Sequence, residues 1–204
     1  MELLDNLIGA TTAVELAEEE ERLSKARAMQ LWDDGLIDEL VPGTVECLFE
    51  IHRHLFQDVY AFAGKQRTEN IAKDNSRFAH VAYLDDQLWH INEFEDSTLP
   101  QIVEKYAELN VAHPFREGNG RALRLWLDIL LDKRLGLRVQ WGNISRDDYM
   151  QAMIRSHVNT TELRVLLEDN MVPSSDQTRE IFAHSVNTSY LYEGYATFDA
   201  NTLD

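Results

Sequence analysis

The segment from His113 to Arg124, which reads His-Pro-Phe-Arg-Glu-Gly-Asn-Gly-Arg-Ala-Leu-Arg, gathers the residue types that phosphate chemistry requires. Gly118 and Gly120 permit backbone conformations in which successive amides face the same way, and such amides at a helix N-terminus bind anions. Arg121 and Arg124 fall in the first turn of the helix that follows, where each positive charge opposes the helix dipole by about 0.3–1 kcal/mol. We therefore expect an anionic ligand here, and a triphosphate suits the site because its oxygens match guanidinium groups.

Two other side chains of this segment could act on a bound phosphate. Pro114 disfavours helical geometry at His113, so the imidazole leaves the preceding helix. Histidine titrates near neutral pH, which suits His113 to take a proton from an attacking hydroxyl. Glu117 places a carboxylate beside the anion loop, the oxygen ligand that a phosphate-bound Mg²⁺ favours. Pieces as short as His-Pro-Phe or Gly-Asn-Gly occur as ordinary turns, but their combination at this spacing favours a catalytic site.

The complete segment resembles the signature of the Fic family, His-Pro-Phe-x-Asp/Glu-Gly-Asn-Gly-Arg-x-x-Arg, and departs from it at no fixed position. The flanking sequence is similar to the family as well, over about residues 9–195. The resemblance implies a protein adenylyltransferase, which uses Mg²⁺ (or Mn²⁺) and transfers AMP from ATP to a Tyr, Thr or Ser hydroxyl of a target protein. By this resemblance, His113 is the general base and Glu117 is the metal ligand. An anion hole around the α- and β-phosphates is formed by Gly118, Asn119 and Gly120. The β- and γ-phosphates are held by Arg121 and Arg124.

The resemblance also implies a flap, a hairpin that pairs backbone to backbone with an extended target segment. Residues 64–83 break the helical period, and Asp74-Asn75-Ser76 supply turn residues, so a short, irregular β-hairpin is predicted there. An ordinary surface hairpin is the alternative interpretation. The expected target-docking residues are Ile71, Lys73 and Phe78. Candidates to flank the adenine, with core or interface packing as the alternative, are Trp141, Asn143 and Tyr149.

The end of the chain carries a second motif, Ser189-Tyr190-Leu191-Tyr192-Glu193-Gly194. It resembles the inhibitory motif of stand-alone Fic proteins, in which Ser or Thr precedes Glu by four residues on a helix that Gly ends. By this resemblance, Ser189 and Glu193 share one face of an inhibitory helix, and Glu193 pairs with Arg124 in the γ-phosphate site. Tyr190 is the expected site of autoadenylylation. An exposed Glu near a frayed terminus is the alternative.

Several other functions stay open at this point. A Fic-fold kinase binds ATP in the reverse direction and transfers phosphate, but such proteins have Lys in place of the second Gly of Gly-Asn-Gly, here Gly120. Variants that transfer UMP or phosphocholine share the signature, so the nucleotide is less determined than the reaction type. An inactive Fic-fold binding module is a different class, and it would have no need of His113, Glu117 and both arginines. No P-loop pattern is present.

The helical period dominates the remaining sequence and predicts an all-α fold with a short β-hairpin. Helices are expected over about residues 14–31, 44–64, 85–94, from 100 to the motif, from the motif to 136, and over 146–155, 161–170 and 177–193. We expect a single Fic domain over residues 1–204. It would contain the flap at about 64–84 and the inhibitory helix at about 177–195.

Composition argues against several other classes of protein. The formal net charge is −17 at pH 7 and the sequence has no basic stripe, which argues against direct binding of nucleic acid. No apolar run is long enough to span a membrane, and the N-terminus lacks the pattern of a signal peptide. Cys47 is the only cysteine, which suits a reducing cytoplasm. Resemblance to related stand-alone bacterial enzymes suggests a type II topoisomerase subunit as the target and predicts a homo-oligomer.

Overall fold

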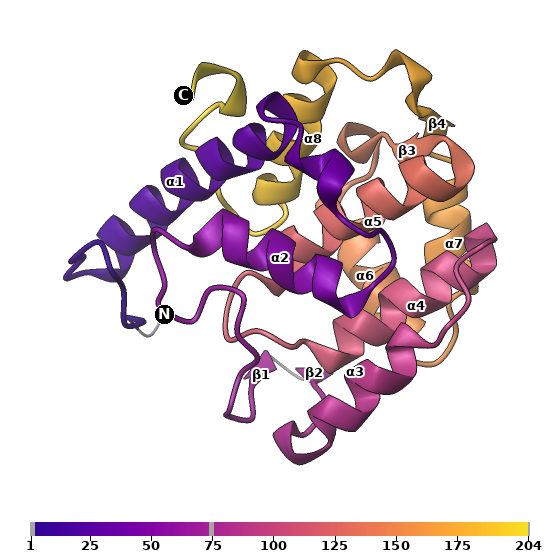
Figure 1. Ribbon diagram of the computed structural model, residues 1–204, viewed down its shortest axis with the longest axis horizontal. Coiled ribbons are helices and arrows are strands. Elements are labelled where there is room, and N and C mark those ends of the chain that lie inside the picture. Colours follow the sequence, from indigo (N-terminus) through magenta and orange to yellow (C-terminus); the bar gives the residue numbers. More distant parts are fainter. Residues whose placement is uncertain (1–2, 74–75, 204) are drawn as a thin grey trace.

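A computed structural model describes residues 3–73 and 76–203, without the side chains of residues 72–77. Eight α-helices form most of this described part of the chain (Figure 1). They are α1 (Ala13–Asp33), α2 (Val45–Phe56), α3 (Leu84–Asn92), α4 (Leu99–Ala112), α5 (Asn119–Leu135), α6 (Arg146–Ser156), α7 (Thr161–Glu168) and α8 (Arg179–Leu191). The predicted mainly helical fold with a short hairpin is confirmed.

Hydroxyl side chains begin most of these helices. Thr12 accepts the amide of Glu15, whose carboxylate reaches back to the amide of Thr12, so α1 starts with a capping box. Thr98 and Gln101 repeat this arrangement at the start of α4, where Pro100 occupies the first turn. Each such cap contributes about 1 kcal/mol, because it bonds amides that the helix itself leaves without partners.

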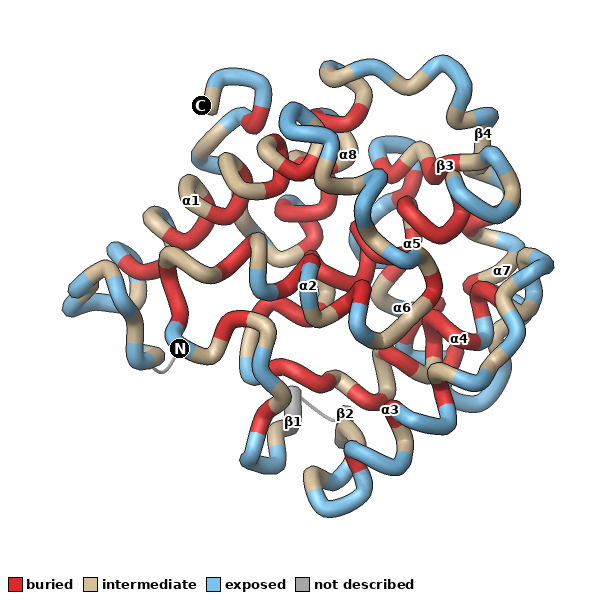
Figure 2. The backbone as a smooth tube through the Cα atoms, viewed as in Figure 1, coloured by how far each residue is buried: buried red, intermediate tan, exposed pale blue. Residues whose placement is uncertain are grey.

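The central helix of the core is α5, which packs against α2, α4 and α8. Figure 2 shows buried residues along α5 and along the helices that surround it. One apolar face of α5 is buried throughout; it consists of Leu123, Trp126, Leu127, Leu130 and Leu131. Burial of each large apolar side chain contributes about 1.5–3 kcal/mol. The second half of the motif lies in the first turns of α5 and is therefore held by a well-packed helix.

Helix α2 is shorter than the sequence predicts. It was expected to end at Gly64, but α2 ends at Phe56 and residues 57–64 form successive turns. The physical reason lies at Val59, whose carbonyl accepts the amide of Leu7 at 2.8 Å, outside any helix. Turn hydrogen bonds such as Ala63 N to Tyr60 O then replace the helical ladder.

The described strands are short and form two separate antiparallel pairs. In the predicted flap, β1 (Ala72–Lys73) pairs with β2 (Ser76–Arg77). A second pair, β3 (Leu137–Val139) and β4 (Met171–Pro173), was not predicted. Strands of three residues are too short to show a period of two, and only Gly136, which ends α5 with φ of 64°, marks the change of direction.

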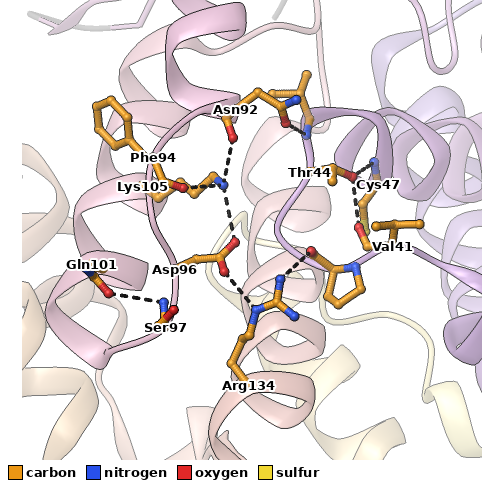
Figure 3. A network of polar contacts seen from close by, with 12 residues as sticks. Val41, Thr44, Cys47, Asn92, Phe94, Asp96, Ser97, Gln101, Lys105 and Arg134 are labelled. Carbon is orange, nitrogen blue, oxygen red and sulfur yellow. Dashed lines mark hydrogen bonds and ion pairs between the residues drawn. The ribbon is translucent and has the colours of Figure 1, made fainter.

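The connection between α3 and α4 is fixed by a buried lysine (Figure 3). Lys105 Nζ donates to the carbonyl of Phe94 at 3.1 Å and lies 3.3 Å from Asp96 Oδ2. The other carboxylate oxygen of Asp96 accepts Arg134 Nε at 2.8 Å, near the end of α5. Gly43 lies against this carboxylate, where a Cβ atom would clash with it. The network therefore holds the C-terminal end of α5, at the opposite end from the motif.

Candidate active site

The motif forms a tight loop between α4 and α5. His113 follows the last residue of α4 and has φ of 47°, which makes it the one residue other than glycine with positive φ in the described part of the chain. Gly118 precedes α5 with φ of 79°. Phe115 lies between these two residues. The side chain of Asn119 accepts the amide of Phe115 at 2.9 Å and donates to the carbonyl of Phe115 at 2.7 Å. Asn119 thus shapes the loop by holding its backbone.

The imidazole of His113 is held on two sides. Its Nδ1 lies 3.1 Å from the carbonyl of Asn110, which can only accept, so Nδ1 carries the proton and the lone pair of the neutral ring is on Nε2. The ring of Phe78 stacks on it with centroids 3.6 Å apart and an interplanar angle of 11°. A base with its lone pair on Nε2 is the form that accepts a proton from a hydroxyl.

A buried arginine that the sequence analysis did not single out joins the flap to this loop. Arg67 is 5% exposed and donates to four backbone carbonyls. Two belong to the flap, Glu69 at 2.7 Å and Ala79 at 2.5 Å, and two to the end of α4, Ala112 at 3.2 Å and His113 at 2.8 Å. The unusual backbone at His113 is thereby stabilised by a charge-assisted hydrogen bond.

The floor of the loop is aromatic. Phe115 is fully buried and stacks on His52 with ring centroids 3.7 Å apart. His52 Nε2 donates to the carbonyl of Glu117 at 2.8 Å, and Nδ1 accepts the amide of Gly64 at 2.9 Å. Burial lowers the pKa of His52 to about 3, so this ring is neutral and supports the loop from below.

Glu117 is the candidate metal ligand at the rim of the loop. Its side chain is 44% exposed, and Oε1 accepts the amide of Gly118 at 2.9 Å and Arg121 Nη2 at 3.3 Å. Within residues 3–73 and 76–203, no group of three or more His, Cys, Asp or Glu could hold a metal. A single accessible carboxylate fits Mg²⁺, which commonly binds through one or two carboxylates together with substrate phosphates.

In this structure Arg121 bonds to the loop through Glu117 and to α1 through its other terminal nitrogen. Its guanidinium is buried and donates through Nη1 to Glu20 of α1, whose carboxylate also accepts the hydroxyl of Tyr60. Three aromatic rings surround it at 4.7, 5.3 and 5.0 Å: Phe56, Tyr190 and Tyr195. Glu20 was not identified from the sequence, because the pattern of a charged amphipathic helix predicts that its acidic side chains are exposed to solvent.

Arg124 and the C-terminal motif meet in the structure. Arg124 is buried; its Nε donates to Ser189 Oγ at 2.7 Å and its Nη2 to Ser189 O at 2.7 Å and Glu193 Oε1 at 3.0 Å. Burial alone would lower the pKa of Arg124, but the negative charge and hydrogen bond of Glu193, together with Tyr149 and Tyr106, outweigh burial and raise that pKa. Gly120 lies directly below, where a Cβ atom would clash with Glu193 Oε1. The carboxylate thus sits at the first turn of α5.

Glu193 itself lies beyond the last residue of α8. The predicted helix reached 193, whereas α8 ends at Leu191 and Glu193 belongs to the turn that follows. The amide of Gly194 donates to Leu191 O, and the amide of Tyr195 donates to Tyr190 O, each at 3.0 Å. With φ of 91° at Gly194, this is the Schellman pattern that ends a helix. Gly194 therefore ends the helix as predicted. The last residue of α8 is Leu191, two residues before the predicted end at Glu193.

Tyr190, the predicted site of self-modification, is 2% exposed. Its ring faces α1, with Lys25 Nζ 5.2 Å and the Arg121 guanidinium 5.3 Å from the ring centroid. Tyr192 is 3% exposed and donates to the carbonyls of Trp141 and Ile144. Neither hydroxyl is accessible while α8 is packed.

The flap lies next to His113. Phe78 follows β2, and the next amide, of Ala79, donates to Val111 O of α4 at 3.0 Å. Ile71 precedes β1 and is half-buried. Lys73 lies in β1, and its side chain, like Asp74 and Asn75 of the predicted turn, falls outside the described part of the structure.

The proposed adenine neighbours divide between core and surface. Trp141 is buried and donates through Nε1 to Asp128 at 2.8 Å. Tyr149 is also buried, with its ring edge-on to Trp141 at 5.6 Å. Asn143 is exposed. The two aromatic residues pack in the core, and the ring of Tyr149 lies 5.6 Å from the Arg124 guanidinium.

Comparison with known proteins identifies the motif and its surroundings. Residues 42–131 match the Fic/DOC family. The chain is 30% identical over 200 residues to the protein adenylyltransferase VbhT of Bartonella schoenbuchensis, which covers 91% of this chain and 41% of VbhT. It is 28% identical over 163 residues to a probable protein adenylyltransferase Fic of Salmonella typhimurium, covering 74% of this chain and 78% of that protein. The chain thus spans less than half the length of VbhT.

Solved structures show the same fold. The BepC protein of Bartonella tribocorum with bound AMPPNP superposes with a TM-score of 0.67 at 21% identity, covering 83% of this chain and 92% of BepC. The N-terminal Fic domain of a Bartonella quintana effector with bound ADP gives 0.69 at 21% identity, covering 84% and 92%. No helix of the described residues is long and apolar enough to cross a membrane. With the complete signature on the loop between α4 and α5, the chain carries a Fic domain.

Proposed function

We propose that this chain is a protein adenylyltransferase, which transfers AMP from ATP to a Tyr, Thr or Ser hydroxyl of a target protein. The observation that carries the proposal is the position of His113, oriented by Asn110 and Phe78 at the edge of a glycine loop that leads into the N-terminus of α5. A general base beside an anion-binding helix terminus is the arrangement that nucleotidyl transfer requires. The names of VbhT and of the Salmonella relative support the same reaction.

In the proposed reaction, the target hydroxyl oxygen attacks the α-phosphorus of ATP. The new bond joins oxygen to phosphorus, the bond to the β-phosphate oxygen breaks, and pyrophosphate leaves. His113 takes the hydroxyl proton at Nε2, because Nδ1 is already bonded to Asn110 O. The amides around Gly118 and Gly120, with the N-terminus of α5, would stabilise the charge that develops on the phosphates.

The two arginines differ in how directly they can bind phosphates. Arg124 would reach the γ-phosphate once Glu193 leaves, since both anions compete for the same guanidinium. Arg121 would have to leave Glu20 to contact a phosphate, as both ends of its guanidinium already face carboxylates. In this structure Arg121 supports the site indirectly, through Glu117.

Glu117 is the proposed Mg²⁺ ligand. A bound Mg²⁺ would neutralise charge on the leaving pyrophosphate. The half-exposed carboxylate at the rim of the loop fits this role, and its hydrogen bond from the Gly118 amide fixes its orientation toward the loop. A binding measurement with ADP and Mn²⁺, in place of ATP and Mg²⁺, would test Glu117 as the metal ligand independently of turnover.

The flap is the proposed docking site for the target. A strand of the target would pair with β1 or β2 by backbone hydrogen bonds, which tolerate many target sequences. Phe78 and Arg67 support this role, because they couple the base of the flap to the His113 ring and backbone. A type II topoisomerase subunit is the first target to assay, with the homo-oligomer and a cytoplasmic site of action as further parts of the proposal.

We also propose that the C-terminal segment inhibits the enzyme. The carboxylate of Glu193 lies at the first turn of α5 and binds Arg124. A γ-phosphate in the productive orientation would need this position, so ATP would bind in another orientation or more weakly. Modification of Tyr190 would follow release of α8, because its hydroxyl is buried while the helix is packed.

Intact-mass analysis tests the proposed reaction. The Glu193→Gly variant is incubated with ATP and Mg²⁺, alone and with a candidate target, and the expected product carries one added AMP. His113→Ala in the same background should give no adduct, and UTP in place of ATP tests the nucleotide. A phosphate adduct instead of AMP would assign the chain to the kinase alternative.

A further inference from the structure

The chain folds back along α1 after Glu193. We call residues 195–202 the C-terminal strap; the strap ends in a short 3-10 turn over Ala200–Thr202. Figure 1 shows this end of the chain beside α1 and α8, and the 3-10 turn contacts both helices. The strap therefore lies against the two helices that flank the inhibitory turn.

The strap docks on a buried ion pair of α1. The side chains of Glu21 and Lys25 are each 1% exposed, and Lys25 Nζ lies 2.8 Å from Glu21 Oε1. The carboxylate of Glu21 accepts the amides of Thr197 and Phe198 at 3.2 and 3.1 Å. Lys25 Nζ donates to the carbonyl of Phe198 at 2.6 Å. All of these contacts reach the backbone of the strap, so they do not depend on its side chains.

The strap and the ion pair stabilise each other. Burial of two charges is favourable only when their remaining hydrogen-bonding capacity is filled, because desolvation otherwise exceeds their mutual attraction. Here two amides and one carbonyl of the strap fill that capacity. Hydrogen bonds to charged groups are also stronger than those between neutral groups. Docking of the strap and burial of the pair are thus coupled.

A second anchor joins the strap to α8. Asn187 Nδ2 donates to Asp199 Oδ1 at 2.8 Å, and Asn187 Oδ1 accepts the amide of Ala200 at 3.0 Å. Ala200 is fully buried, so a larger side chain at this position would displace the strap. Through these contacts the strap connects the inhibitory helix to α1.

Glu193 lies in the short turn between these two anchored segments. Upstream, Ser189 of α8 is bonded to Arg124 through its side chain and its carbonyl. Downstream, the first strap residue, Tyr195, donates its amide to Tyr190 O, and its ring lies 5.0 Å from the Arg121 guanidinium. The position of the Glu193 carboxylate is therefore determined from both sides.

We propose that the C-terminal strap is a latch. While docked on Glu21 and Lys25 it holds Glu193 against Arg124, and its release is the step that opens the anion loop to ATP. This inference rests on the proposed function, in which Glu193 is inhibitory.

The test uses two substitutions that loosen the strap at different points and leave Arg124, Glu193 and the motif unchanged. Ala200→Glu introduces a charged side chain into a buried position, and Asn187→Ala removes the second anchor. Asn201→Ala is the matched control, because Asn201 is exposed and bonds only to Asp199 among the described residues. Labelling from [α-³²P]ATP is measured in the full chain, together with hydrogen exchange of the Thr197 and Phe198 amides.

Both strap variants should exchange these amides faster and label about five-fold faster or more, up to the rate of Glu193→Gly. Asn201→Ala should match the wild type in both measurements. The latch is wrong if the strap variants exchange faster but label at the wild-type rate while Glu193→Gly is activated. If Glu193→Gly is not activated either, the proposed self-inhibition fails, which separates the two results. Asn187→Ala keeps the test valid if Ala200→Glu does not fold.

Discussion

The carboxylate of Glu193 lies directly over Gly120, so close that any Cβ atom on Gly120 would clash with it. Gly120 is in the first turn of α5, where the helix dipole favours negative charge. The second glycine of the motif therefore does more than shape the loop. It leaves room at the helix terminus for an anion, and the chain's own C-terminal segment supplies that anion in this structure.

Replacement of Glu193 should activate the enzyme. In Glu193→Gly, Arg124 no longer has a carboxylate partner and can bind a phosphate of ATP. A charge-assisted contact of this kind corresponds to about 1–3 kcal/mol, or about five- to 150-fold in rate or affinity. Labelling with [α-³²P]ATP measures the rate. Glu180→Gly, an exposed acidic residue of the first turn of α8, serves as the control and should leave the rate unchanged. Equal rates for Glu193→Gly and wild type would contradict self-inhibition.

His113→Ala in the activated background should lower the rate of AMP transfer by about 10²–10⁴-fold, because general base catalysis contributes about that much. ATP affinity should change little, since the imidazole acts on the hydroxyl and the phosphates bind to the loop amides. Isothermal titration with a nonhydrolysable ATP analogue measures the affinity separately. Phe78→Leu should have a smaller effect on the rate, because it removes only the ring that stacks on His113. A His113→Ala enzyme with full activity at saturating ATP would remove this residue from its proposed role.

The sequence was informative where local rules decide the structure. The extent of α5 and the glycines of the motif follow from short-range geometry, so these elements were predicted. The end of α2 was wrong because it depends on a partner far away in the sequence: Leu7 bonds the carbonyl of Val59. No pattern within residues 45–64 contains that information.

The site shows the same division. The motif itself is contiguous, so its candidate residues could be read from one segment. Glu20 and Arg67 come from other parts of the chain, and each became recognisable only through its buried partners, Arg121 and the backbone carbonyls at the base of the flap. Buried charges of this kind look like ordinary surface residues in a sequence, because their burial is a tertiary property.

The pair of Glu20 and Arg121 should be strongly coupled in stability. Removal of either partner leaves the other charge buried without compensation, which costs about 3–5 kcal/mol. Glu20→Gln and Arg121→Gln should therefore each lower the free energy of unfolding by about that amount. The double variant should cost clearly less than the sum, and urea unfolding of all four proteins gives the coupling free energy. Additive losses would mean that the two side chains do not depend on each other, contrary to the contact seen here.

The last prediction concerns the buried ring of His52 and the dependence of stability on pH. An unfolded histidine binds a proton near pH 6.5, whereas burial keeps His52 neutral in the folded protein down to about pH 3. Between these values the unfolded state binds more protons, so the free energy of unfolding falls as the pH decreases. The contribution of His52 to this slope is at most about 1.4 kcal/mol per pH unit.

His52→Gln removes the titrating group and retains a donor for the carbonyl of Glu117, which His52 Nε2 bonds at 2.8 Å. The variant should be less stable at pH 7, because Gly64 loses its acceptor. Its free energy of unfolding should nevertheless change less steeply between pH 6.5 and 5 than that of the wild type. Urea unfolding at several pH values in this range measures both slopes. Other acidic and histidine residues titrate in both proteins, so the difference between the slopes isolates His52. Identical slopes would show that His52 takes up its proton in the folded state, which the two hydrogen bonds of a buried neutral ring would not permit.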